Sequence, residues 1–158
     1  MAERRALSFA DLDDAIADVD RLLAGHVTVG RWSLGQICNH LATGFRLLRV
    51  GGLEPVTSRT VPEAVRIRFF RNGRFPDGVV APHPALFPGP GLDDRDEADA
   101  LRKAVAHFTT SPGPFPPHPF LGPLSKEDWN RFHCMHAAHH LGFAVPGPPG
   151  DAPDLNSK

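Results

Sequence analysis

The sequence predicts an all-α protein, a helical bundle with long proline-rich connections, and three observations lead to this prediction. Apolar residues recur at helical spacing in several segments, with no convincing strand pattern and no internal repeat. The 158 residues include 17 basic and 18 acidic side chains and are 41% hydrophobic, as expected of one soluble domain. Eleven of the 17 prolines fall between residues 76 and 123, so extended connections are expected there.

The first two helices are expected over residues 8–24 and 32–50. Ser8 is a suitable N-cap for the first, because Asp residues crowd the turn that follows it. In the second, Ser33 and Gln36 are spaced for reciprocal capping of free backbone N–H groups. Both segments carry one apolar face, as a helix packed in a bundle requires.

Three further helices are expected over residues 62–71, 93–108 and 125–143. The first has Pro62 at an early position, where its missing donor costs little, and the second begins with acidic residues. Ser125 provides an N-cap for the last helix, and early negative charge supports that helix start. We therefore expect a single domain over residues 1–145 and a flexible Pro/Gly-rich tail over residues 146–158.

Composition and chain start also limit the partners and the location. The formal net charge of -1 does not match the basic footprint of a nucleic-acid-binding protein. No apolar run is long enough for a membrane span, and no apolar signal core follows the first residues. We expect a cytoplasmic protein that binds neither nucleic acid nor membrane.

Histidine is the most unusual component of the sequence. Four of the nine histidines lie between residues 133 and 140. His136 and His140 are four residues apart, so their β-carbons would lie about 5–6 Å apart on one helix face and could hold one ion. His133 falls within the same arc, whereas His139 is turned about 100° away from His140. A catalytic metal usually has three protein ligands, and His40 of the second helix is the natural third.

Other interpretations of these histidines stay open at this point. A histidine pair at this spacing often lies on a solvated helix face, and a single helical histidine is often a hydrogen-bonded core residue. The remaining histidines, among them His118, are expected to be structural or exposed. The basic run of residues 66–74 could line a pocket for an anionic substrate, although such a run is more often a solvated helix face.

The order of several motifs resembles a known superfamily. Trp32-Ser33, then His40-Leu41-Ala42 after six residues, and His136-Ala137-Ala138-His139-His140 near the end resemble the DinB/YfiT superfamily of four-helix-bundle metalloproteins. Within it, residues 119–129, which lead into His133, resemble a bacterial subfamily known only as a domain of unknown function. The resemblance covers about residues 8–145. It implies that the second and last helices bring three histidines to one divalent metal, and the matching positions are His40, His136 and His140.

The chain departs from the subfamily pattern in two places. Residues 141–145 are mainly apolar where the resemblance leads us to expect polar or charged side chains, and the proline-rich region 76–123 is expanded. Both departures concern the walls of a pocket and leave the three histidines unchanged. The substrate of better-known relatives therefore cannot be transferred to this chain.

The expected function is that of a small metal-dependent enzyme. Three neutral imidazoles leave the charge of a divalent ion uncompensated, so the ion can activate water or a thiol for transfer or hydrolysis. Zinc is the expected ion, and nickel and iron are alternatives, because nitrogen ligands suit all three. His133 is a candidate hydrogen-bond partner of the site or a proton shuttle.

The expected partner is a small-molecule substrate, including a low-molecular-weight thiol, and the family resemblance suggests a homodimer. One alternative function is a non-catalytic module in which the metal only ties two helices together. Another is a metal-free helical protein that binds a ligand. A metal site with an open position beside a cavity would favour the enzyme.

Overall fold

The computed structural model describes residues 2–50, 60–79, 81 and 83–148, and this part of the chain is mostly helical. The α-helices are α1 (Leu12–Leu23), α2 (Leu34–Val50), α3 (Glu63–Asn72), α4 (Asp94–Thr110) and α5 (Lys126–Leu141). A single 3₁₀ turn, η1 (Pro84–Leu86), lies in the proline-rich region. The predicted all-α fold class is confirmed.

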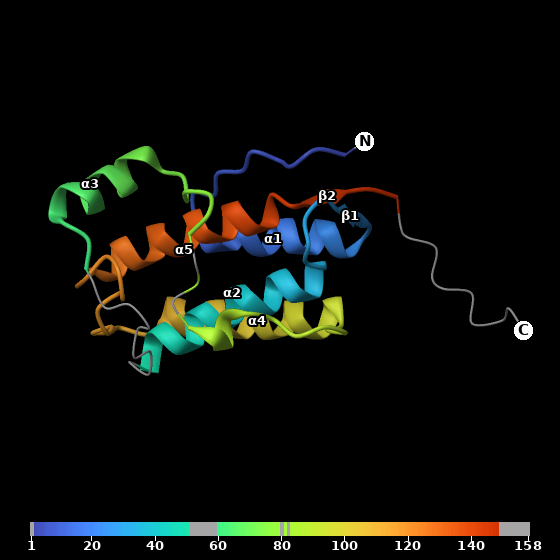
Figure 1. Cartoon of the computed structure of the whole chain (residues 1–158). Helices are drawn as coiled ribbons and strands as arrows, with labels where there is room; N and C mark the ends of the chain where they lie inside the picture. Colours follow the sequence, from blue (N-terminus) through green and yellow to red (C-terminus); the bar gives the residue numbers. More distant parts are fainter. Residues whose placement is uncertain (1, 51–59, 80, 82, 149–158) are drawn as a thin grey trace, which may run out of the picture.

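Four of the helices form a two-layered bundle. In Figure 1, α1 lies beside α5 in one layer and α2 lies beside α4 in the other. Between the layers lies a core of buried apolar side chains, of which the largest are Trp129, Leu22, Leu34, Ile37 and Leu141. The fifth helix, α3, lies outside the four, near the start of α5 (Figure 1). Arg131 of α5 holds it by donating to the carbonyl oxygen of Phe70 at 2.9 Å.

Side-chain caps begin most of the helices. Ser33 and Gln36 form the predicted reciprocal cap of α2, with hydrogen bonds of 3.1 and 3.0 Å. The Ser125 hydroxyl accepts the N–H of Asp128 at the start of α5. The predicted cap of the first helix is wrong, because α1 begins after Asp11, whose carboxylate accepts the N–H of Asp14. Asp is as good an N-cap as Ser, and the residues around Ser8 run on as an extended segment.

The prediction that the chain has no strand is also wrong. Strands β1 (His26–Thr28) and β2 (Ala144–Pro146) pair antiparallel, with Val27 opposite Val145. Three-residue strands are too short to show a periodic pattern, so sequence analysis could not detect them. This small sheet joins the end of α1 to the end of α5 and fixes the exit of the last helix.

The N-terminal segment packs against the end of α5 and against α1. The N–H of Arg5 bonds to the carbonyl oxygen of Gly142, and its guanidinium forms a two-pronged ion pair with buried Asp18 at 2.9 and 2.7 Å. Of the predicted tail, Pro146 ends β2, and residues 149–158 lie outside the described residues. Among the described residues, none of the helices is long and apolar enough to cross a membrane.

Candidate metal centre

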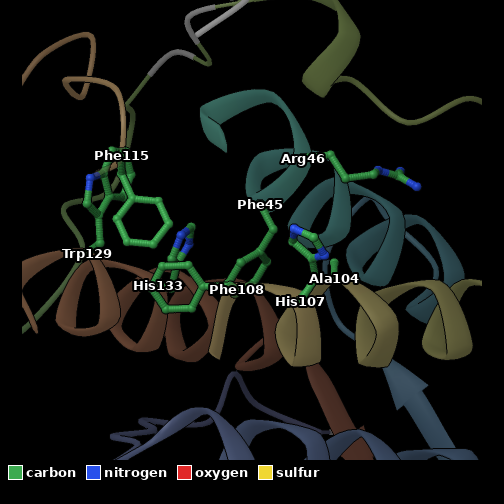
Figure 2. A pocket seen from close by; sticks show the side chains of 8 residues that line it. All are labelled: Phe45, Arg46, Ala104, His107, Phe108, Phe115, Trp129 and His133. Atoms are coloured by element: carbon green, nitrogen blue, oxygen red, sulfur yellow. The ribbon is translucent and has the colours of Figure 1, made fainter. Parts of the chain in front are cut away.

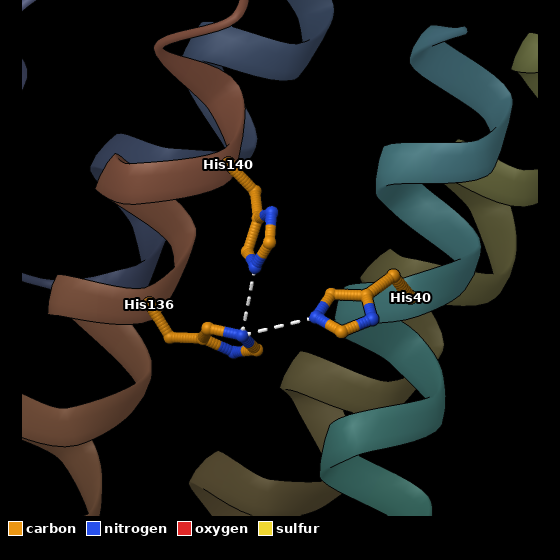
Figure 3. A group of neighbouring side chains, drawn as sticks. All are labelled: His40, His136 and His140. Carbon is orange, nitrogen blue, oxygen red and sulfur yellow. Dashed lines mark hydrogen bonds between the residues drawn. The ribbon is translucent and has the colours of Figure 1, made fainter. Parts of the chain in front are cut away.

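Helices α2 and α5 together supply the three predicted histidine ligands. The side-chain amide of Asn39 donates to Glu97 of α4 at 2.9 Å, which fixes the rotation of α2 against its neighbour. The next residue along a helix is turned by about 100°, so His40 faces α5. His136 and His140 come from successive turns of α5 and face α2 (Figure 3).

The three imidazoles converge through the same ring atom. Nε2 of His136 lies 3.0 Å from Nε2 of His40 and 3.0 Å from Nε2 of His140 (Figure 3). Two nitrogen ligands that are each about 2.0–2.1 Å from one ion lie about 2.9–3.4 Å apart at bond angles of 90–110°. The two separations from His136 fit this range, and the ligand nitrogens of the three histidines all lie within 4.8 Å of one another, so the cluster could hold a single divalent ion.

The protonation of the ring nitrogens supports the same interpretation. Nδ1 of His40 lies 2.6 Å from the carbonyl oxygen of Leu86, so this nitrogen carries the proton and Nε2 keeps its lone pair. Nε2 of His136 carries at most one proton, so it cannot donate a hydrogen bond to Nε2 of both His40 and His140. Lone pairs therefore face one another at the centre of the cluster, where a cation is the natural partner.

Aromatic rings hold the imidazoles in place. Trp32 stacks on His140 with ring centres 5.5 Å apart, and Phe132 stacks on His136 at 5.6 Å. Phe75 lies 5.0 Å from His136 on another side. Together with the hydrogen bond from His40 to Leu86, these contacts restrict the ring orientations in the way that metal sites require of their outer partners.

Burial keeps these imidazoles neutral and available as ligands. It lowers the pKa of His40, an effect that the hydrogen bond to Leu86 partly opposes. Burial, followed by the charges of neighbouring histidines, lowers the pKa of His136 well below its usual value and that of His140 to about 2. Because only the neutral ring has a free lone pair, the site suits a metal at neutral pH.

A cavity of about 360 Å³ opens beside the cluster, and all three histidines contribute to its wall. An adjoining cavity of about 750 Å³ shares Phe75, Phe87 and His118 with the first. Much of both walls comes from described residues within 75–79, 81, 83–87 and 118–121. The proline-rich region, which sequence analysis associated with the walls of a pocket, therefore forms a large part of these walls.

His133, the candidate hydrogen-bond partner or proton shuttle, lies elsewhere in the core. Its ring is buried and stacked on Phe45, with ring centres 3.8 Å apart, and it lies 5.5 Å from Trp129 (Figure 2). It borders a separate small cavity. In the described structure no hydrogen bond joins it to the three histidines, so its role in proton transfer stays a prediction.

The structure also shows where His139 and the arginines of residues 66–74 lie. His139 lies outside the cluster, and its Nδ1 lies 2.9 Å from Arg4. Arg68, Arg71 and Arg74 are exposed, and no arginine of this run is among the described residues that line the two cavities. The run therefore does not form the wall of an anion pocket there.

Sequence reasoning missed several residues that shape the site. The carbonyl oxygen of Leu86 and the ring of Phe75 lie in connections whose path no periodic pattern predicts. Trp32 was part of the motif that carried the family resemblance, but its stacking on His140 was not foreseen. The position of Trp32, two residues before α2 and close in sequence to His40, was the signal that could have indicated a contact with the site.

The fold and the site together define a class: a helical bundle with a three-histidine cluster that could bind a metal, set in the wall of a pocket. The chain belongs to the family described as "Protein of unknown function (DUF1569)", whose model matches residues 1–147. No curated protein and no solved structure matches the chain. The wider relation to the DinB/YfiT superfamily stays a prediction from the motifs.

Proposed function

We propose that this protein is a metal-dependent enzyme that acts on a small molecule, with His40, His136 and His140 as the metal ligands. The observation that carries the proposal is the convergence of three Nε2 atoms at the wall of a cavity. Among the described residues, no fourth histidine, cysteine or carboxylate joins this cluster. A site with three protein ligands beside a cavity is typical of catalytic metals, whereas structural sites usually have four.

The chain's own residues set the properties of the site. The carbonyl oxygen of Leu86 fixes the tautomer of His40, and the stacked Trp32 fixes the plane of His140. Phe75 and Phe132 lie against the ring of His136, with ring centres 5.0 and 5.6 Å away, and restrict its orientation. These contacts preorganise the ligands, so little reorganisation is needed for binding.

A bound divalent metal would supply a Lewis acid that lowers the pKa of a water or thiol. The nitrogen donors suit zinc, with nickel and iron as alternatives. We infer that the reaction is a transfer to or from a low-molecular-weight thiol, or a hydrolysis. The alternative, a non-catalytic metal-binding module, does not explain why a cavity opens beside the ligands.

Metal analysis of tag-free protein tests the site. We expect about one equivalent of a divalent metal in the wild-type chain and a large loss in His40→Ala and in His140→Ala. His107→Ala, which removes an exposed histidine of α4, is the matched control and should retain the metal. Unchanged metal content in both cluster variants would overturn the ligand assignment.

Activity is tested with the metal-loaded protein. Low-molecular-weight thiols are screened with small electrophiles, and esters and amides are screened for hydrolysis. We expect turnover that requires the metal and is absent in His140→Ala. If the metal binds with the expected stoichiometry and no reaction is found with any of the metals, the module becomes the better description.

A further inference from the structure

The pocket beside the three histidines contains no charged side chain among the described residues that line it. Its walls are formed by aromatic and aliphatic side chains together with histidines. Asp77 lies between two lining residues, but its carboxylate is paired with Arg4 at 2.9 Å. A ligand with a net charge would lose hydration here without gaining an ionic partner, which is costly in an apolar site.

A glycine in the wall of this pocket keeps space open. Gly44 lies one turn after His40 on α2 and borders the cavity. Apart from the backbone of its own helix and its chain neighbours, a β-carbon added there would meet no described atom within 4 Å, so close packing does not explain the glycine. Glycine inside a helix costs about 0.5–1 kcal/mol relative to alanine. The missing side chain has an evident use, since it leaves room for a ligand beside the histidines.

His118 provides a polar group in the wall of both cavities. Its Nδ1 accepts the N–H groups of Phe120 at 3.0 Å and Leu121 at 3.1 Å. Burial lowers the pKa of His118 to about 4, so the ring is neutral at neutral pH and its proton lies on Nε2. Within the described part of the chain, this N–H has no hydrogen-bond acceptor.

From these observations we propose that the pocket binds an uncharged, mainly apolar small molecule that occupies the space beside Gly44 and accepts a hydrogen bond from Nε2–H of His118. This identifies the substrate class of the proposed enzyme and rests on that function for its biological meaning. The binding itself depends on the pocket and needs no metal. The combined cavity size suits a molecule with two fused aromatic rings or larger.

Binding is measured with the full-length, chelator-treated protein, so that no metal contributes. The uncharged fluorophore N-phenyl-1-naphthylamine reports occupancy of the pocket, and three compounds of similar shape compete with it. These are 2-acetylnaphthalene, which offers an acceptor, 2-ethylnaphthalene, which offers none, and 2-naphthoate, which is charged. We expect the ketone to bind about 3- to 10-fold more tightly than the hydrocarbon, as one neutral hydrogen bond allows, and the carboxylate to bind most weakly.

Two pairs of variants test whether the ligand lies beside Gly44 and bonds to His118. His118→Asn keeps an acceptor for the backbone N–H groups and removes the Nε2 donor, so the preference for the ketone should disappear while hydrocarbon binding persists. His83→Asn is its control, because His83 lines the larger cavity and also accepts a backbone N–H; the preference should persist there. Gly44→Leu should reduce binding of all ligands at least 10-fold with no loss of thermal stability, and Gly44→Ala should reduce it much less.

The outcomes separate this inference from the metal proposal. Equal affinity for ketone and hydrocarbon in the wild-type chain, or tightest binding of the carboxylate, would overturn the inference without any variant. Unchanged affinity in Gly44→Leu would also overturn it. If the neutral ligands bind as expected but metal analysis shows no metal in the wild-type chain, the pocket assignment stands and the enzyme proposal fails.

Discussion

The Nδ1 atom of His40 lies 2.6 Å from the carbonyl oxygen of Leu86, which belongs to a connection 46 residues further along the chain. This hydrogen bond fixes the tautomer of His40 and directs its Nε2 lone pair toward His136. The proline-rich region is therefore part of the candidate metal centre as well as of the pocket wall. Through this hydrogen bond, the order of the connection that contains Leu86 affects the metal affinity of the site.

A first prediction follows from that link. Leu86 ends the short turn η1, in which Pro84 restricts the backbone and His83 caps the N–H of Ala85. Pro84→Gly increases the freedom that must be lost when the turn orders. We expect metal affinity to fall by about 3- to 10-fold with unchanged stoichiometry, which is less than the ~10–100-fold typical of deleting an outer partner.

Competition with a chromophoric chelator measures this affinity. Pro90→Gly is the control, because Pro90 lies in the same region and outside η1. An equal loss in both variants would mean that general loosening of the connection, and not the Leu86 carbonyl, sets the affinity.

A second prediction concerns Trp32, whose ring stacks on His140. The chain has two tryptophans, and Trp129 is buried in the core. Binding of paramagnetic Ni²⁺ at the three histidines should quench the emission of Trp32. In Trp32→Phe we expect this quenching to fall at least several-fold, while Trp129 continues to emit. Fluorescence titration with Ni²⁺ measures the effect, and full quenching in Trp32→Phe would place the ion elsewhere.

The sequence predicted most of the helical framework, for identifiable reasons. Caps such as Ser33 with Gln36 are local, so three or four residues determine them. The start of α1 was misplaced because Ser8 and Asp11 are equally good caps and a tertiary contact decides between them. The N–H of Arg5 bonds to the carbonyl oxygen of Gly142 after α5, and this contact holds the residues before α1 outside the helix. Contacts of this kind have no local signature.

In the candidate site, too, local sequence patterns predict some residues and miss others. The spacing of His136 and His140 is a property of one helix, and His40 follows from packing two helices together. Leu86 lies in the single short turn η1 and Phe75 in an irregular connection, and neither segment has a periodic pattern that predicts its position against the histidines. The chemistry of the pocket, which depends on those connections, could therefore be learned only from the structure.

A third prediction concerns the ion pair of Arg5 with Asp18, which anchors the N-terminal segment to α1. Arg5 also donates to the carbonyl oxygens of Leu141, at the end of α5, and of Ala144, at the start of β2. Among the described residues, Arg5→Ala leaves the buried carboxylate of Asp18 with Arg21, 3.2 Å away, as its remaining ion-pair partner. We expect a loss of about 3 kcal/mol in the free energy of unfolding, as for other broken buried pairs.

Urea denaturation measures this loss. Arg5→Lys should recover only part of the stability, since an ammonium group cannot reproduce the two-pronged contact. Arg102→Ala is the matched control, because Arg102 pairs with the exposed Asp20 and Asp99; it should cost less than about 1 kcal/mol. Equal losses at the two positions would contradict the special role of Arg5.

The last prediction concerns the pH dependence of stability and His133. Burial, and secondarily the charge of His118, lowers the pKa of His133 to about 3, whereas the ordinary value is 6.5. Above pH 6.5 the ring is neutral in both the folded and the unfolded chain and contributes no pH dependence. As the pH falls below 6.5, the unfolded chain binds a proton that the folded chain does not, so stability decreases toward pH 3.

Replacing the ring isolates this contribution. His133→Phe keeps a ring that can stack on Phe45 and removes the titrating group. Between pH 6.5 and 4.5 we expect the wild-type chain to lose about 2–3 kcal/mol more of its free energy of unfolding than the variant, since one pKa unit corresponds to about 1.4 kcal/mol. Urea denaturation of both metal-free proteins across this range provides the measurement. Parallel pH profiles would show that His133 is protonated in the folded chain and that its surroundings are more polar than the stacked rings indicate.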